Sequence, residues 1–291
     1  MRIIFTVILT LLCFSNTASA EKLKFVQVTD THLSANGANY QGRDLEASVQ
    51  ILKAAIKSIN NTNAIDFVTF SGDNIDVSNE DDLRKFCEIT KEVNKPYYIT
   101  VGDHDISKHQ GLNKTQYIEI VKQYNKNQKS SDTYYYFFPN KDFIVIVMDG
   151  VMSGFITSSH GSYGEEDLAW LDEVLTKYSN KKAIIIQHFP LVAPYDNKSH
   201  TTIEPEAYFT LLNNHKNVIA LLSGHYHGGN KVTIQDGVYH ISTPALVSSP
   251  HQYRVVEIDY DHDSLFQESP KFDLKTEIIP VEGEAVLNQK D

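Results

Sequence analysis

The chain has 291 residues and a formal net charge of −11, with 26 Lys and Arg against 37 Asp and Glu. This charge argues against binding of a nucleic-acid duplex, because proteins hold phosphate backbones with clustered Lys and Arg. The length is ample for a sizeable hydrophobic core.

The first twenty residues have the pattern of a secretory signal peptide. Arg2 precedes an apolar run over residues 3–14, and small residues at 18–20 offer a cleavage site before Glu21. The apolar run is shorter than the roughly 20 residues that span a bilayer, so we expect no membrane span. We expect residues 1–20 to be removed and the mature chain, 291 − 20 = 271 residues, to be exported to the periplasm or the exterior. Its one cysteine, Cys87, excludes an intramolecular disulfide and is interpreted as a small buried side chain in a helix.

Strand-like and helix-like segments alternate along the mature chain. The apolar runs at 143–148 and 183–186 are typical of strands buried on both faces. The other expected strands are 23–29, 67–70, 97–101 and 218–222, and the expected helices are 45–59, 83–93 and 168–175. This alternation predicts one α/β domain over residues 21–291, a layered sandwich with central mixed β-sheets flanked by helices. Several short strands are expected in a β-rich C-terminal tail over 232–279.

Five short polar segments share one placement, because each begins where a predicted strand ends. In α/β folds, ligand sites gather at the carboxyl ends of the strands. We therefore expect these segments to meet although they are far apart in the sequence. They are Asp-Thr-His at 30–32, Gly-Asp at 72–73, Gly-Asp-His-Asp at 102–105, Gln-His at 187–188 and Gly-His-Tyr-His at 224–227.

The side chains in these segments are those of a metal site. Imidazole and carboxylate together suit Mn, Fe, Zn or Ni. The absence of cysteine from the segments excludes a thiolate zinc site. Asp-x-His and His-x-His place two ligands on the same side of an extended backbone. Each segment alone is weak evidence for a metal site, since a lone Gly-Asp is usually a turn. Five such segments at strand ends together predict a metal centre.

In order and spacing, the segments resemble the calcineurin-like metallophosphoesterase superfamily, whose pattern is D-x-H, G-D, G-N-H-D/E, H and G-H-x-H. The resemblance covers about 200 residues. Residues 29–33, 168–171 and 188–190 are most similar to the cyclic-nucleotide-phosphodiesterase-like branch. The resemblance implies the calcineurin-like phosphoesterase fold. It also implies hydrolysis of phosphodiester or phosphomonoester bonds in small substrates by a hydroxide that two divalent or trivalent metal ions activate.

The resemblance also implies a role for each motif residue. It implies two ligand sets that share Asp73: Asp30, His32 and His227 for one metal, and Asp103, His188 and His225 for the other. His104 would be the catalytic acid beside the leaving group. Asp105 would orient His104, as carboxylates near catalytic or ligating histidines do.

Asp103 departs from the family pattern, which usually has Asn at this position. An Asn amide can give its oxygen to a metal and its N–H groups to the substrate phosphate, whereas a carboxylate only accepts. This difference leaves an alternative open, a metal- or ligand-binding protein on the same scaffold with weak or no catalysis. The oligomeric state is also left open.

Overall fold

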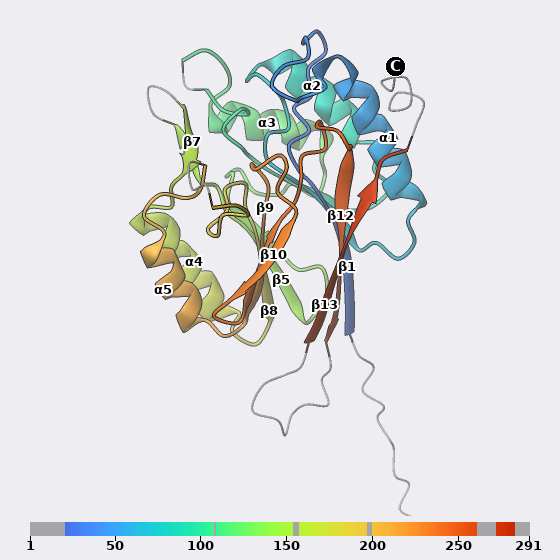
Figure 1. Cartoon of the computed structure of the whole chain (residues 1–291). Coiled ribbons are helices and arrows are strands. Elements are labelled where there is room, and N and C mark those ends of the chain that lie inside the picture. Colours follow the sequence, from blue (N-terminus) through green and yellow to red (C-terminus); the bar gives the residue numbers. More distant parts are fainter. Residues whose placement is uncertain (1–20, 108, 154–156, 197–199, 261–271, 283–291) are drawn as a thin grey trace, which may run out of the picture.

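Two facing β-sheets form the centre of the molecule, and helices cover the outer face of each (Figure 1). The computed structural model describes residues 21–107, 109–153, 157–196, 200–260 and 272–282. The expected signal peptide, residues 1–20, lies outside these ranges. The layered α/β fold predicted from the alternation of elements is confirmed.

The first sheet has the strand order β13-β12-β1-β2-β3. β1, β2 and β3 are parallel, whereas β12 and β13 are added in antiparallel fashion. Their bounds are Glu21–Val28 (β1), Phe67–Ser71 (β2), Tyr97–Thr100 (β3), Gln252–Tyr260 (β12) and Phe272–Pro280 (β13).

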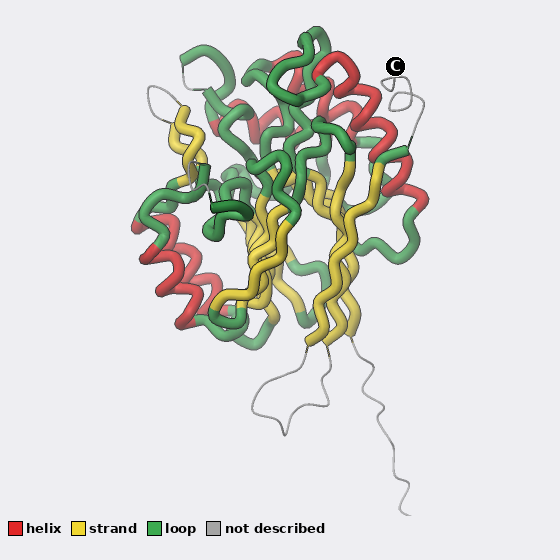
Figure 2. Tube along the Cα trace, viewed as in Figure 1, coloured by secondary structure: helices red, strands yellow, loops and turns green. Residues whose placement is uncertain are grey.

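The second sheet has the order β10-β11-β9-β8-β5-β4, with β5, β8, β9 and β11 parallel. Its strands are Tyr135–Phe137 (β4), Phe143–Val147 (β5), Lys182–Ile186 (β8), Val218–Ser223 (β9), Lys231–Gln235 (β10) and Val238–Ser242 (β11). A separate hairpin pairs β6, Val151–Ser153, with β7, Thr157–Gly161. Figure 2 shows the strands of both sheets running side by side through the molecule.

Each sheet carries its own helices. The first sheet packs against α1, Ser48–Asn61, α2, Glu80–Thr90, and α3, Lys114–Tyr124, with a short 3-10 helix, Leu45–Ala47, before α1. The second sheet packs against α4, Glu165–Lys177, and α5, Glu206–Asn214. Polar side chains cap the start of two of these helices. The Asn79 side chain accepts from the Asp82 amide at the start of α2, and Asn113 and Gln116 form a capping box on α3.

Apolar side chains of both sheets meet between them. Phe25 and Phe67 stack at 4.7 Å in the first sheet and face Val145, Ile184 and Leu222 of the second. The continuous apolar runs over β5 and β8 are therefore buried on both faces, as predicted. This packing holds the carboxyl ends of the two sets of parallel strands at one end of the sandwich.

Some expectations need correction. Helices α3 and α5 were not predicted. The strands expected in the C-terminal tail are present and are divided between the sheets: β10 and β11 complete the second sheet, whereas β12 and β13 complete the first. In the aromatic segment 134–138, Tyr135 is buried but Tyr134 and Phe138 are exposed. These two aromatics flank β4, an edge strand with solvent on one side.

The interpretation of Cys87 as a buried packing residue agrees with the structure. Cys87 is a free, buried thiol whose pKa burial raises to about 12, so it is a packing residue. No helix in the described ranges is both long and apolar enough to cross a membrane.

Arg254 on β12 joins the two sheets. It is 2% exposed and donates from Nε to Thr243 Oγ1 at 2.9 Å and from Nη2 to Asn230 Oδ1 at 2.6 Å, both beyond the ends of second-sheet strands. Nη2 also donates to the Ser242 carbonyl at 3.0 Å, and Nη1 to Thr276 Oγ1 at 2.8 Å. Burial lowers the pKa of Arg254 to about 10.

We expect Arg254→Met to lower the free energy of unfolding by about 2–4 kcal/mol, because two buried acceptors, Thr243 Oγ1 and the Ser242 carbonyl, would lose their donor. Urea denaturation of the purified protein would measure the change. The matched control is Arg84→Met, whose side chain is 34% exposed and pairs with Glu80; it should change the free energy by about 0.5 kcal/mol or less. Equal effects of the two substitutions would contradict the joining role.

Candidate metal centre

All five polar segments lie just beyond strands of the two sheets. The segments after β1, β2 and β3 come from neighbouring parallel strands of the first sheet, and those after β8 and β9 from neighbouring strands of the second. Backbone hydrogen bonds tie them together: the Asp30 amide donates to the Gly72 carbonyl at 3.0 Å, and the Gly224 amide to the His188 carbonyl at 3.0 Å. The two sheets thus deliver the predicted residues to one place.

The backbone is left-handed at four of the motif residues. The φ angles are 51° at Asp30, 37° at His32, 50° at Asp73 and 69° at His225. Such conformations cost of order 1–3 kcal/mol each for residues other than glycine, and they persist where the surroundings impose them. This concentration of strain at motif residues is typical of a functional site.

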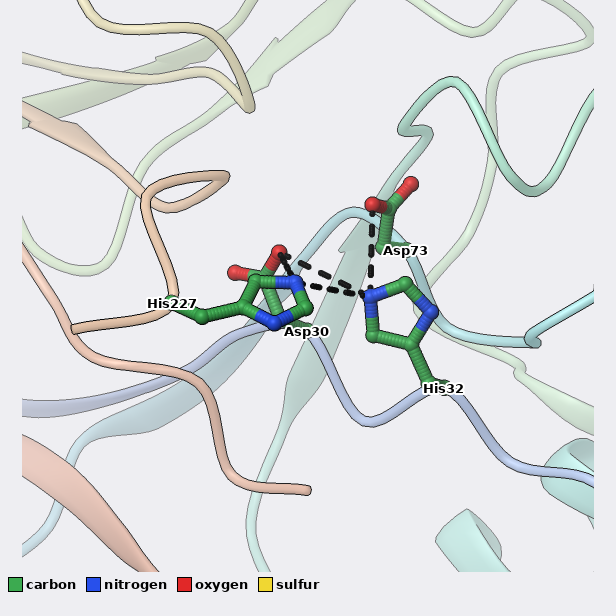
Figure 3. A group of neighbouring side chains, drawn as sticks. All are labelled: Asp30, His32, Asp73 and His227. Atoms are coloured by element: carbon green, nitrogen blue, oxygen red, sulfur yellow. Dashed lines mark hydrogen bonds and ion pairs between the residues drawn. The ribbon is translucent and has the colours of Figure 1, made fainter. Parts of the chain in front are cut away.

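The first group of side chains comprises Asp30, His32, Asp73 and His227, whose ligand atoms point toward one another (Figure 3). His32 Nε2 lies 3.0 Å from His227 Nε2 and 3.5 Å from Asp73 Oδ2. Asp30 Oδ1 lies 3.5 Å from His227 Nε2 and 4.0 Å from His32 Nε2.

The second group comprises Asp73, Asp103, His188 and His225. His188 Nε2 lies 3.1 Å from His225 Nδ1 and 3.3 Å from Asp73 Oδ2. Asp103 Oδ1 lies 3.3 Å from His225 Nδ1 and 3.5 Å from His188 Nε2. Asp73 Oδ2 therefore belongs to both groups, and the seven predicted ligands are brought together.

The geometry of both groups fits a metal ion. Atoms at about 2.0–2.2 Å from one cation lie roughly 3.0–3.5 Å apart, close to the separations here. The facing ring nitrogens of His32 and His227 have no reason to approach at 3.0 Å unless a cation or a proton lies between them. Asp30 Oδ1 and Asp103 Oδ1 are buried without a hydrogen-bond partner in the described residues. A buried carboxylate oxygen without a partner is costly, and a bound cation would remove this cost.

The electrostatics of the protein alone support this fit. Burial by itself would raise the pKa of Asp73, but the charges of His188 and His104 outweigh it and hold that pKa well below its ordinary value. At His188, burial by itself would lower the pKa, but the negative charges of Asp73 and Asp103 outweigh it and hold that pKa well above its ordinary value. Without metal, the cluster therefore retains positive charge as a proton on His188, and a metal ion would displace this proton.

Oxygen acceptors behind the ring fix three of the histidines. His188 Nδ1 lies 2.9 Å from the Ser71 carbonyl, and His225 Nε2 lies 2.9 Å from the Ser159 carbonyl. His32 Nδ1 lies 3.1 Å from Asp76 Oδ1. Each contact leaves the other ring nitrogen facing the ligand groups, as in metal sites with well-oriented histidines. Sequence reasoning missed Asp76, for which the available signal was its position three residues after Asp73.

The expected contact between Asp105 and His104 is wrong. The Asp105 carboxylate is fully buried and accepts from the amides of Gly102 at 2.8 Å, Asn74 at 2.9 Å and Ile75 at 3.1 Å. It therefore holds together the turns that follow β2 and β3. Burial and the charge of Asp73 raise the pKa of Asp105 to about 7.

His104 is oriented by other groups. Its ring Nδ1 lies 2.5 Å from the Asp76 carbonyl, and its amide donates to Asp73 Oδ1 at 2.9 Å. Burial opposes protonation, but Asp73, the Asp76 carbonyl and Asp103 together raise the pKa of His104. A proton donor at neutral pH is consistent with this direction.

A cleft of about 470 Å³ opens over both groups. This volume suits a small molecule. Sequence reasoning did not single out Tyr40, Gln41, Arg43 or Ser159 of its lining. The cleft is lined by Tyr40, Gln41, Arg43, Asp73, Asp103, His104, Ser159, His200, His225 and His227.

Comparison with known proteins confirms the resemblance drawn from the motifs. The family model for calcineurin-like phosphoesterases matches residues 23–229. The chain is 28% identical over 209 residues to a probable glycerophosphodiester phosphodiesterase from Arcobacter nitrofigilis, covering 69% of this chain and 71% of that protein. It is 27% identical over 220 residues to a 3′,5′-cyclic adenosine monophosphate phosphodiesterase from Haemophilus influenzae, covering 72% of each.

The fold has a counterpart of similar size. The crystal structure of a dimetal phosphatase from Danio rerio superposes with a TM-score of 0.65 at 16% identity, covering 89% of this chain and 99% of that one. At this identity the likeness concerns the fold.

We expect the protein loaded with Mn²⁺ to hold about two ions per chain, the number that dinuclear sites take. Asp73→Ala should lower this content below about one ion, because its carboxylate belongs to both groups, whereas His227→Ala should leave about one. Elemental analysis after dialysis would measure the content. The control is Asp273→Ala, whose side chain is 63% exposed on β13. Full metal content in Asp73→Ala would refute the shared ligand.

Proposed function

The chain belongs to the calcineurin-like phosphoesterase family and hydrolyses phosphoester bonds with the help of metal ions, and from this premise we propose that it prefers small phosphodiesters to phosphomonoesters. The observation that carries the preference is the charge of the cleft. Among the described residues that line it, Arg43 is the one Lys or Arg, and its Nη1 is already 2.7 Å from Asp76 Oδ1. Asp103 adds a carboxylate to the same cleft.

This balance of charge suits a monoanion. A phosphomonoester carries a charge of about −1.5 to −2 at neutral pH, whereas a diester carries one negative charge. Bringing the second charge beside Asp103 costs free energy. Only bound metal ions could offset this cost, because the described lining offers no Lys or Arg beyond Arg43. The two relatives named above, both called phosphodiesterases, support the same preference.

We assign the metal ions to the two groups that share Asp73. When bound there, metal ions of this kind polarise phosphoryl oxygens and lower the pKa of water. The donor set of imidazole and carboxylate suits Mn, Fe, Zn or Ni. The role of the chain itself is to hold these donors with buried supports, such as the Ser71 carbonyl behind His188.

His104 is assigned as the proton donor to the leaving oxygen. Its Nδ1 is held by the Asp76 carbonyl, so Nε2 is the ring nitrogen left for the substrate in a side chain that lines the cleft. The raised pKa keeps more of the imidazole protonated at neutral pH, which a general acid requires. The Asp73 carboxylate accepts from the His104 backbone amide, so the distance between the metal ligand Asp73 and the proton donor His104 is fixed.

The alternative of a binding protein without efficient catalysis is not favoured. Both ligand groups are complete in spite of Asp103, and His104 lies in the same cleft. A protein that only bound metal would not need an oriented imidazole beside the centre.

We also propose that the protein is exported. The support is the sequence of residues 1–20, a charged start, a short apolar run and a small-residue cleavage site. Mass spectrometry of the protein recovered from the periplasm or the medium should give a chain that begins at Glu21. Recovery of the uncleaved chain from the cytoplasm alone would refute export.

With Mn²⁺ present, kcat/KM for bis(p-nitrophenyl) phosphate should exceed that for p-nitrophenyl phosphate by about tenfold or more, a difference of about 1.4 kcal/mol. Release of nitrophenolate measures both reactions. EDTA-treated protein and Asp73→Ala are the controls, and both should be inactive. Faster hydrolysis of the monoester would overturn the preference while leaving the family activity intact.

His104→Ala should slow turnover by about 10²–10⁴-fold for diesters with alkyl leaving groups, the usual contribution of a general acid. The effect should be smaller for nitrophenyl esters, since a good leaving group needs less protonation. Metal content, measured on the same sample, should stay near that of the wild type. Parallel loss of metal and activity would make His104 a ligand.

A further inference from the structure

A two-residue turn at the rim of the cleft places Arg43. The Arg43 amide donates to the Tyr40 carbonyl at 2.9 Å, and the Tyr40 amide donates to the Arg43 carbonyl at 3.2 Å. The two residues between them have positive φ, 49° at Gln41 and 77° at Gly42, as in the tightest hairpin turns. The position of Arg43 is therefore set by the backbone.

The turn is anchored to the rest of the fold on its C-terminal side. The Asp44 amide donates to the Val247 carbonyl at 3.1 Å, and Asp44 Oδ2 lies 3.2 Å from His251 Nε2. His251 is itself buried, with Nδ1 2.9 Å from the Leu246 carbonyl. Arg43 is thus held before any substrate binds, which lowers the entropic cost of using it.

The guanidinium of Arg43 has donors to spare. The side chain is 9% exposed, and Nη1 contacts Asp76 Oδ1 at 2.7 Å and His32 Nδ1 at 3.4 Å. The guanidinium carbon also lies 5.6 Å from the centre of the Tyr40 ring. A guanidinium has five N–H donors, and within the described ranges no acceptor contacts Nε or Nη2. A nearly buried guanidinium with unused donors beside a cleft is suited to an anionic ligand.

The same cleft lacks a donor at position 103. An Asn there could donate to a phosphate oxygen, but the Asp103 carboxylate can only accept and adds negative charge. Arg43, Asp103 and His104 line one cleft. A bound phosphodiester would therefore meet the guanidinium on one side and the carboxylate on another.

We propose that Arg43 is a catalytic residue that donates from Nε or Nη2 to a non-bridging oxygen of the bound phosphodiester, supplying the donor and the charge that Asp103 does not. The inference rests on the proposed phosphodiesterase function. Charge that grows on the phosphoryl oxygens during the reaction would be stabilised by a donor already in place.

The experiment must distinguish this role from that of a residue that only positions a metal ligand. Because Arg43 contacts Asp76, and Asp76 contacts His32, the arginine could act only by positioning that metal ligand. A positioning residue would change metal content, whereas a substrate contact would change phosphate binding with the metals retained.

The experiment compares Arg43→Gln, Arg43→Lys and the control Arg84→Gln, a partly exposed arginine on α2 that pairs with Glu80. We measure kcat/KM for bis(p-nitrophenyl) phosphate, the inhibition constant of inorganic phosphate and metal content. Arg43→Gln should lower kcat/KM by about 10- to 100-fold, the range for a hydrogen bond to a charged group. It should weaken phosphate binding and keep the metals. Arg43→Lys, which retains the charge but not the fork of donors, should fall between, and Arg84→Gln should match the wild type.

A double-mutant cycle with Asp103→Asn tests the compensation. Asp103→Asn should raise kcat/KM at saturating metal, by less than about tenfold, because ground-state binding shares the new contact. In that background Arg43→Gln should cost less than in the wild type, since the amide now also donates to the phosphate. Additive effects would overturn the compensation.

Two results would overturn the catalytic role of Arg43. One is loss of metal in proportion to activity in Arg43→Gln, which would make Arg43 a positioning residue for His32. The other is phosphate binding and kcat/KM within about twofold of the wild type, a change too small for a charged hydrogen bond. If the wild type hydrolyses no diester, the proposed function fails. Calorimetric titration of inorganic phosphate into the metal-loaded wild type and Arg43→Gln then still decides whether Arg43 contacts the anion.

Discussion

The carboxylate of Asp73 is the constraint on which the site depends. It is buried, and its Oδ2 lies 3.5 Å from His32 Nε2 and 3.3 Å from His188 Nε2. His32 follows a strand of the first sheet and His188 a strand of the second. A buried carboxylate is stable only among donors and cations, so the two sheets must bring their strand ends together around it. The apolar layer between the sheets supplies the free energy that holds them there.

Close approach of the backbone explains the glycines before the motif aspartates. A Cβ at Gly102 would lie 2.2 Å from Asp73 Oδ1, and one at Gly72 would lie 2.5 Å from His188 Nδ1. Any side chain at either position would displace a member of the site. Asp105 accepts from the amides of both turns and so keeps them in register. The site is therefore built on a backbone scaffold as much as on its ligands.

Charge in the cleft is divided between the two sides of the centre. Asp103 places a carboxylate beside His188 and His225, whereas Arg43 places a guanidinium near His32, partly neutralised by Asp76. This arrangement differs from an Asn at position 103, where one side chain would both hold metal and donate to phosphate. Separating the two tasks lets the carboxylate bind its metal strongly while another residue addresses the substrate.

The sequence by itself determined the ligand types, their placement at strand ends and the layered fold, because strand patterns and short motifs are local signals. Nine residues were selected in this way, and the structure gathers all of them around Asp73 except that Asp105 serves the turns and not His104. Only the tertiary structure assigned the supporting contacts. The roles of Asp76 and Arg43 depend on which turns meet across the site. Two of the partners of Asp105, the amides of Asn74 and Ile75, lie 31 and 30 residues away in the chain. Side-chain contacts between distant turns leave no periodic or compositional trace in the sequence, so packing alone decides them.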